Sequence, residues 1–169
     1  GSVFDKMDVP EPAFEFSELS HDSVKQETLG IAYDGRWKNV GEISFSVSKA
    51  HFRKETVIPD VPSAVTDAKP WLYNGTAAAN VTSAITLYAG YARGLEESGV
   101  APPNAINRNQ PLAAVITEQK DAGVRIGIAR KLTLVAGVFD LTRPYFGYDA
   151  SSFYKQIGTV RSKGAEFSI

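Results

Sequence analysis

The chain has 169 residues, of which 43% are hydrophobic and 22% charged, and its 18 Lys and Arg nearly balance its 19 Asp and Glu. This composition is typical of a folded chain and provides no basic excess for binding nucleic acid. It contains no Cys and only two His, which excludes disulfides and Cys-ligated metals and leaves little for a histidine metal centre. We therefore expect no cofactor, no metal and no nucleic acid partner. No segment has the roughly 18 consecutive apolar residues of a membrane helix.

Apolar and polar residues alternate in several segments of the first half, which predicts strands. Around Phe14 and Phe16, a strand and an exposed acidic loop fit the sequence equally well. Two clearer strands are expected over Glu27–Tyr33 and Glu42–Ser48. The apolar face of the second consists of Ile43, Phe45 and Val47.

Further strands are expected in the rest of the chain, where no long segment has the i, i+3, i+4 pattern of an amphipathic helix. Their ranges are Trp71–Val81, Ile85–Arg93, Asp121–Ile128, Leu132–Arg143 and Gly164–Ile169. The predicted fold class is all-β, an antiparallel up-and-down meander of about seven or eight strands. Such a meander can form part of a transmembrane β-barrel or a small complete one.

The connections between the predicted strands alternate in length. Short ones are Asp34–Val40, Thr82–Ala84 and Arg130–Lys131, and long ones are Lys54–Lys69, Leu95–Ile116 and Pro144–Phe153. In a meander, this alternation places all tight turns at one end and all long loops at the other. The same asymmetry is found in outer-membrane barrels, and a soluble sandwich does not need it.

Aromatic residues gather near the predicted ends of the strands. Near the long loops lie Trp71, Tyr73, Tyr91, Tyr145, Phe146, Tyr148, Phe153 and Tyr154, whereas Tyr33 and Trp37 border the first short turn. Two girdles of this kind are expected where a barrel crosses the two membrane interfaces. Aromatic residues are also common in strands of soluble sheets, so this feature alone leaves both interpretations open.

In addition to this pattern, the chain contains several spaced motifs, most of them in its second half, that resemble those of a known family. They are Leu87–Glu96, Ala101–Ala105, Asn107–Asn109, Thr117–Arg125, Val138–Tyr145 and Gly158–Glu166, with Gln26–Ile31, Arg36-Trp37 and Gly41-Glu42 nearer the N-terminus. Taken together, they resemble the barrel of TonB-dependent outer-membrane receptors of the siderophore type. A member of that family has an energy-coupling peptide, a plug and about 22 strands. The resemblance thus implies that residues 1–169 are a single β-barrel segment with no plug domain.

The sequence departs from the family pattern at two places. Lys120-Asp121 stands where an aromatic-Glu pair is more frequent, and the chain ends on Ile169 instead of an aromatic residue. The resemblance implies a transport protein of the bacterial outer membrane and not an enzyme. Its partners would be a ferric siderophore or similar chelate, outer-membrane lipid and lipopolysaccharide, and the TonB complex through parts absent from this chain.

Cationic, amide and aromatic groups on the long loops are the candidate ligand-binding residues. Ferric siderophores are often anionic and have flat arms, which suits Arg charge, amide hydrogen bonds and Tyr stacking. Loop Asn residues also form turns, and interfacial Tyr residues also belong to the girdle. The candidates are Arg93, Asn104, Asn107, Arg108, Tyr145, Tyr148 and Tyr154.

Catalytic arrangements are weak in this sequence. The pairs Glu96-Glu97 and Asp60 with Asp67 lack a fixed separation for glycoside hydrolysis. The run Ser20-His21-Asp22 lacks a Gly-x-Ser-x-Gly nucleophile motif, and triad members meet in space instead of in a row.

Two other functions fit the strand pattern. One is a soluble β-sandwich ligand-binding module, in which Ile43, Phe45 and Val47 face a protein core. The other is a small complete outer-membrane barrel with a structural or adhesive role. Finally, His51 with Lys49 and Arg53 is compatible with a contact to lipopolysaccharide or with a solvated strand end.

Overall fold

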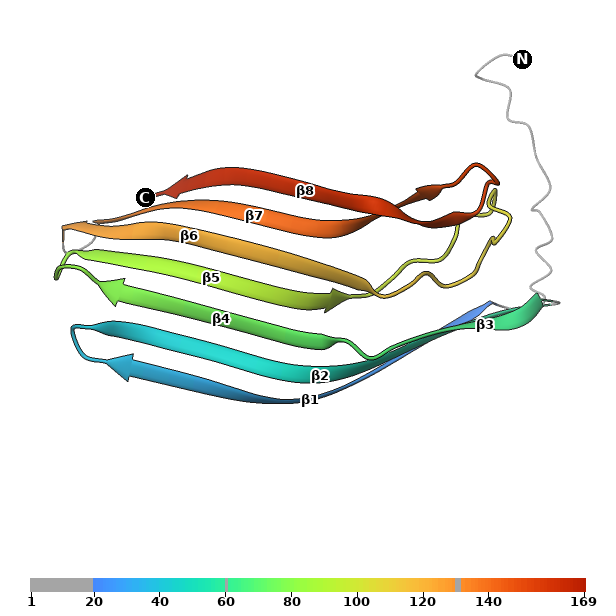
Figure 1. The fold of residues 1–169 in the computed structure, drawn as a ribbon, viewed down its shortest axis with the longest axis horizontal. Coiled ribbons are helices and arrows are strands. Elements are labelled where there is room, and N and C mark those ends of the chain that lie inside the picture. The colour runs from blue at the N-terminus through green and yellow to red at the C-terminus, as the bar shows by residue number, and fades with distance from the viewer. Residues whose placement is uncertain (1–19, 60, 130–131) are drawn as a thin grey trace, which may run out of the picture.

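The computed structural model describes residues 20–59, 61–129 and 132–169, which form antiparallel strands (Figure 1). The strands are β1 (His21–Trp37), β2 (Gly41–Ile58), β3 (Val61–Ala68), β4 (Trp71–Asn80), β5 (Ile85–Glu96), β6 (Val115–Ala129), β7 (Leu132–Tyr148) and β8 (Tyr154–Ser168). Every strand expected from the alternation is present in this part of the chain. The candidate strand at Phe14 and Phe16 lies outside the described residues. Those residues contain no helix that is long and apolar enough to span a membrane.

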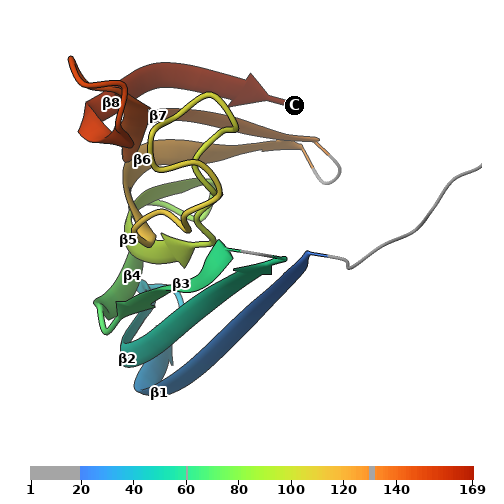
Figure 2. The same cartoon turned by 90° about the vertical axis from the view of Figure 1, so that its right-hand side faces the viewer.

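All strands belong to one sheet with the order β1-β2-β4-β5-β6-β7-β8, and β3 pairs with β2 beside this path. The sheet curves into an open arc, and its two outer strands, β1 and β8, do not pair with each other (Figure 2). The described residues thus form one curved layer. They contain neither the two facing layers of the predicted sandwich nor the closed circle of a small complete barrel.

The first short turn shows how the tight connections form. It links Trp37 to Gly41, which are cross-strand partners, and Asn39 adopts the left-handed conformation with φ of 63°. Gly41 has φ of 155°, and a Cβ there would lie 2.0 Å from the carbonyl oxygen of Ala78. Only glycine fits this close approach of two strands.

The predicted long connection Lys54–Lys69 is wrong, because β2 continues to Ile58 and β3 follows as its hairpin partner. β4 pairs with the first half of β2 and β3 with the second. Between them, the amide of Ala50 donates to the carbonyl of Pro70 at 3.1 Å, so β3 and β4 act as one interrupted strand. The connection at 144–153 is also shorter than predicted, because β7 continues to Tyr148.

The two faces of the sheet differ in chemistry. Because cross-strand partners point to the same side, the register assigns each residue to a face. Ile43, Phe45 and Val47 lie on the convex face and are 39%, 48% and 41% exposed. Glu42 and Ser44 lie on the concave face. The apolar residues therefore line an outer surface instead of a dry interior.

The core of the described chain lies on the concave side, at the end of the long loops. There the loop 97–114 folds into the arc and covers the concave side of β2 (Figure 2). Phe52 is 1% exposed under it. The buried loop residues Ala101, Ala105 and Leu112 pack together, and the rings of Phe146 and Tyr154 pack against them.

Candidate functional site

The loop 97–114 and the β7–β8 turn form a cluster that contains several predicted ligand-binding residues. Asn107 is 6% exposed, its amide nitrogen Nδ2 donates to the carbonyl of Tyr154 at 2.9 Å, and its Oδ1 accepts from the amide of Tyr154 at 2.8 Å. Both polar atoms of this side chain are used to hold the loop against β8. Asn107 thus acts as a clamp between two segments 47 residues apart.

Five other candidates present polar or aromatic groups at this end of the sheet. The hydroxyl of Tyr148 donates to Oδ1 of Asn104, and its ring meets that of Tyr154 edge to face at 5.1 Å. Arg108 is exposed and lines a hollow beside β2 and β3. Tyr145 is 52% exposed. The structure therefore brings Asn104, Tyr148 and Tyr154 into contact and leaves Arg108 and Tyr145 accessible.

Arg93 is the predicted site residue that lies apart from this cluster. It is on the convex face of β5, where it pairs with Glu118 and its guanidinium lies 5.7 Å from the ring centroid of Tyr73. The alternation in the sequence already indicates that Arg93 lies on the apolar face of its strand, because it is in phase with Leu87 and Tyr91.

Sequence reasoning missed a second attachment of the loop. Lys54 lies on the concave face of β2 with 5% of its side chain exposed. Its Nζ donates to Oε1 of Glu97 at 2.9 Å and to the carbonyl of Ser98 at 2.8 Å. Nothing in the local sequence indicates this contact, because its partners are 43 and 44 residues apart along the chain.

The carboxylates considered for catalysis hold structural contacts. Glu96 accepts from the hydroxyl of Thr117 and pairs with Arg143 at 3.3 Å. Asp67 lies 2.7 Å from His51. Asp60 lies outside the described residues. His21 and Asp22 are neighbours at the start of β1, where successive side chains point to opposite faces. In the described chain no three His, Asp or Glu residues gather as a metal site.

Asp149 organises the turn between β7 and β8. Its Oδ1 accepts from the amide of Phe153 at 3.0 Å and from the amide and hydroxyl of Ser151 at 2.9 Å each, and Lys155 lies 2.7 Å from Oδ2. The hydrogen bond from Lys155, followed by those from Phe153 and Ser151, holds the pKa of Asp149 well below its ordinary 3.8. The turn is thus stabilised by the ionised carboxylate.

This pKa shift predicts the pH response of the turn. A carboxyl with a lowered folded pKa adds its full stability above its unfolded pKa and loses it progressively as the pH falls from there through the folded value. The folded wild-type turn should still hold an ionised carboxylate somewhat below pH 3.8. The Asp149→Asn variant keeps the Oδ1 acceptor but loses the ion pair with Lys155, so its turn should be less protected at neutral pH, and its difference from wild type should vanish in strong acid. Hydrogen exchange of the Phe153 amide, compared between wild type and Asp149→Asn at neutral and at acidic pH, measures this response. Equal protection of the two proteins at pH 7 would contradict the prediction.

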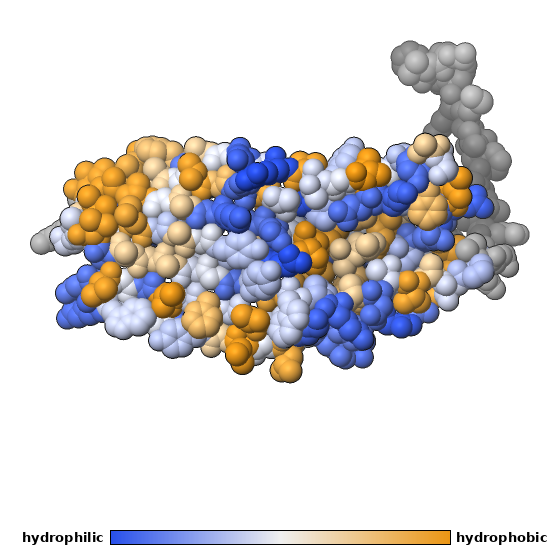
Figure 3. Space-filling view, in the orientation of Figure 1, coloured by the Kyte–Doolittle hydropathy of each residue, from blue (hydrophilic) through white to orange (hydrophobic). Residues whose placement is uncertain are grey.

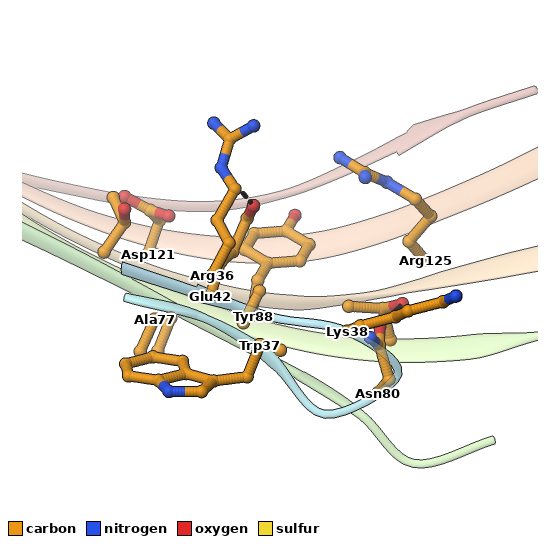
Figure 4. Close-up of a pocket in the computed structure, with 14 residues that line it drawn as sticks. Arg36, Trp37, Lys38, Glu42, Ala77, Asn80, Tyr88, Asp121 and Arg125 are labelled. Atoms are coloured by element: carbon orange, nitrogen blue, oxygen red, sulfur yellow. Dashed lines mark hydrogen bonds and ion pairs between the residues drawn. The ribbon is translucent and has the colours of Figure 1, made fainter. Parts of the chain in front are cut away.

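The concave face has a second hollow near the short turns. Arg36, Glu42, Tyr88 and Arg125 extend to one side of the sheet there, whereas Trp37 points to the other (Figure 4). Arg36 lies 3.5 Å from Glu42. The hollow thus presents both charges and a phenol inside the arc, a surface suited to a polar protein segment.

Tyr88 in this hollow depends on glycines opposite it. A Cβ at Gly123 or Gly137 would lie 2.4 or 2.6 Å from the Tyr88 hydroxyl oxygen. The absence of side chains at these positions lets the ring lie across two neighbouring strands. The alternation assigns Tyr88 to the polar face, but the sequence does not show which glycines it covers.

A line of charged residues marks where the apolar surface of the convex face ends (Figure 3). Counted from the short turns, the first charged convex residues on β8, β7 and β6 are Lys163, Asp140 and Lys120, which are cross-strand partners. The same register row continues to Tyr33 on β1. The first charged convex residue of β1 is Glu27, six positions nearer the long-loop end. The boundary therefore crosses the strands obliquely.

The angle at which this boundary crosses the strands can be compared with the tilt of the strands in outer-membrane barrels. Six residues along a strand span about 20 Å, and six steps between neighbouring strands span about 29 Å. The boundary is therefore inclined by about 35° to the perpendicular of the strands. Strands of outer-membrane barrels tilt by about 35–45° from the membrane normal. At such a tilt, the two ends of this boundary, Glu27 on β1 and Lys163 on β8, lie at about the same level.

Aromatic residues line this boundary on the convex face. The rings of Tyr73 and Tyr91 stack at 5.8 Å, and Nζ of Lys49 lies 5.0 Å from the ring centroid of Trp71. This arrangement agrees with the aromatic girdle expected at one membrane interface.

A curved antiparallel meander with an apolar convex face and a polar concave face defines the wall of a transmembrane β-barrel. Residues 24–169 match the sequence model of the family described as TonB dependent receptor-like, beta-barrel. The chain therefore belongs to the TonB-dependent receptor family, whose members are outer-membrane transporters. The resemblance seen in the sequence is confirmed.

Solved structures show the same fold. BauA, the ferric preacinetobactin receptor from Acinetobacter baumannii, aligns with a TM-score of 0.70 and 19% identity over 94% of this chain and 24% of its own. Fiu, the ferric-catecholate import receptor from K12 E. coli, aligns with a TM-score of 0.61 and 14% identity over 86% of this chain and 25% of its own. The chain thus spans about a quarter of these receptors. No curated protein sequence matches it significantly.

Proposed function

We propose that this chain is a wall segment of a receptor that takes up ferric siderophores across the bacterial outer membrane. The oblique charge boundary carries the proposal, because a soluble sheet has no reason to place its charges along a line inclined like a membrane surface. The apolar residues below this line face hydrocarbon. The long loops above it face the medium, and the short turns face the periplasm.

The ligand-binding surface in this proposal lies at the long-loop end. Asn104, Arg108, Tyr145 and Tyr148 supply an amide, a cation and two phenols there, which suit an anionic chelate with flat arms. Asn107 and Tyr154 act by holding the loop 97–114 in place. Arg93 acts at the membrane boundary. The siderophore receptors BauA and Fiu, which share the fold, support this choice of ligand class.

The concave face provides the contact with the rest of such a receptor. A polar domain inside the arc would fit the mixed charges of Arg36, Glu42, Asp121 and Arg125. The family implies such a domain, the plug. Energy coupling to the TonB complex requires the coupling peptide of that family. The segment itself supplies the wall and the outer rim.

Direct binding tests the proposed ligand class. We expect Arg108→Gln and Tyr148→Phe each to weaken binding of a ferric catecholate by about 3–10-fold in the intact receptor, because each removes a charge or hydrogen bond at an exposed site. Fluorescence quenching on addition of the ferric complex gives the Kd. Lys38→Gln, at the short-turn end, is the matched control and should leave the Kd unchanged. Unchanged binding of a catecholate and a hydroxamate complex by both loop variants would contradict the proposed site.

A further inference from the structure

A hollow of about 280 Å³ lies between the β2–β3 hairpin and the loop 97–114, at the long-loop end of the sheet. Its loop side consists of residues 106–110. Its hairpin side consists of Thr56 and the apolar residues Ile58, Pro62 and Ala64. Pockets that enclose a whole small molecule usually measure about 300–1,000 Å³. The hollow is therefore large enough for one arm of a chelate or for a small acid, and too small for a complete ferric complex.

Contacts within the protein fix both walls of this hollow. On the loop side, the amide of Asn109 donates to the carbonyl of Ala101 at 2.9 Å. Asn109 adopts the left-handed conformation with φ of 64°, which Asn tolerates better than most residues. The hydroxyl of Thr66 on β3 donates to the carbonyl of Pro111 at 3.0 Å, so the loop is tied to the hairpin. A ligand would thus enter a preorganised site, which reduces the entropic cost of binding.

The polar side chains of the hollow have unused hydrogen-bonding capacity and one positive charge. Thr56 is 5% exposed, and among the described residues its hydroxyl is the one buried side-chain polar atom without a hydrogen-bond partner. Burying a hydroxyl without a partner is costly, so its presence here calls for an explanation. Arg108 takes part in none of the ion pairs within the described part of the chain. None of the described residues that line the hollow is acidic.

We propose that this hollow is a subsite for a carboxylate on a short aliphatic stem. Arg108 and the hydroxyl of Thr56 bind the carboxylate, and the stem lies against Ile58 and Ala64. A guanidinium binds a carboxylate through two parallel hydrogen bonds, and one cation balances its single charge. The carboxylate is either an arm of the transported chelate or a free organic acid. The first of these sources rests on the proposed uptake function.

Ligand-observed NMR of the intact receptor in detergent tests the subsite with butyrate and its neutral analogue butyramide. We expect saturable butyrate binding with a Kd on the order of 1 mM, and butyramide binding about tenfold weaker because it carries no charge. Arg108→Gln should remove this difference between the two probes. Thr56→Val should weaken butyrate binding by about 3–10-fold, because it removes one hydrogen bond to a charged group.

Thr56→Val also separates a binding role from a structural one. Valine keeps the shape of threonine without the unpaired hydroxyl, so hydrogen exchange of the Asn109 amide should be no faster than in wild type. Thr28→Val, on the concave face of β1 outside the hollow, is the matched control and should leave butyrate binding unchanged. Equal binding of butyrate and butyramide by wild type, unchanged butyrate binding in Thr56→Val, or an equal loss in Thr28→Val would overturn the proposal.

Competition with a ferric complex identifies the source of the carboxylate. Saturating butyrate should weaken binding of the ferric complex if the carboxylate is an arm of the chelate, and should leave it unchanged if the carboxylate is a free acid. Butyrate binding itself is measured without iron. Receptor that binds butyrate and no ferric complex would therefore contradict the uptake function and leave the subsite established.

Discussion

Phe45→Arg is expected to destabilise the receptor in the membrane by about 2–4 kcal/mol, the usual cost of a cation on the lipid face near the bilayer midplane. Phe45 lies halfway between Gly41 at the short turn and Lys49 at the charge boundary. It is 48% exposed on the convex face, and its ring lies 5.5 Å from that of Tyr33. Denaturant unfolding in vesicles measures the loss.

Ser44→Arg is the matched control for this prediction, because Ser44 is adjacent in sequence and points to the concave face. We expect a change below about 1 kcal/mol, since an arginine there reaches polar neighbours and water. A loss at Ser44 as large as that at Phe45 would show that the convex face does not meet hydrocarbon.

Asn107→Ala is expected to release the loop 97–114 from β8. The change removes two hydrogen bonds and leaves the amide and carbonyl of Tyr154 without their present partners. Each buried group that loses its partner costs about 1–3 kcal/mol, so the loss of two partners should destabilise the loop by about 2–6 kcal/mol. Hydrogen exchange of the Tyr154 amide and of the loop should accelerate strongly, and siderophore affinity should fall with it.

Asn104→Ala serves as the comparison in the same loop. Asn104 is exposed, and its side chain accepts a hydrogen bond from one other side chain, the hydroxyl of Tyr148. Removing this hydrogen bond should cost about 1 kcal/mol or less. Asn107→Asp keeps the acceptor for the Tyr154 amide and should give an intermediate effect. Slow exchange at Tyr154 in Asn107→Ala would contradict the assigned clamp.

The fold could be predicted from the sequence wherever alternation was clean. Strands β2, β5 and β6 repeat apolar residues at every second position, and this period alone assigns both the strand and its faces. β3 was missed because Pro62 and small residues weaken its alternation. Its existence depends on the extra length of β2, whose second half needs a partner.

The candidate site was predictable only in part. Composition and position identified the loops that carry Asn104, Arg108 and Tyr148, and the structure places them at one end of the sheet. The roles of Asn107 and Lys54 could not be predicted, because their contacts join segments more than 40 residues apart. Whether a loop amide faces the medium or holds a backbone is decided by packing and not by the local sequence.

Lipid accessibility along β2 and β8 is the most direct test of the claim that the convex face meets hydrocarbon. These 169 residues contain no Cys, so once any Cys elsewhere in the intact receptor is replaced, single cysteines can carry a spin label at residues 44, 45, 47 and 161. Collisions with oxygen should dominate at 45 and 47, and collisions with a water-soluble nickel complex at 44. Residue 161, in the same register row as 47, should report the headgroup region, because the boundary is inclined. Equal oxygen accessibility at 44 and 45 would contradict the account.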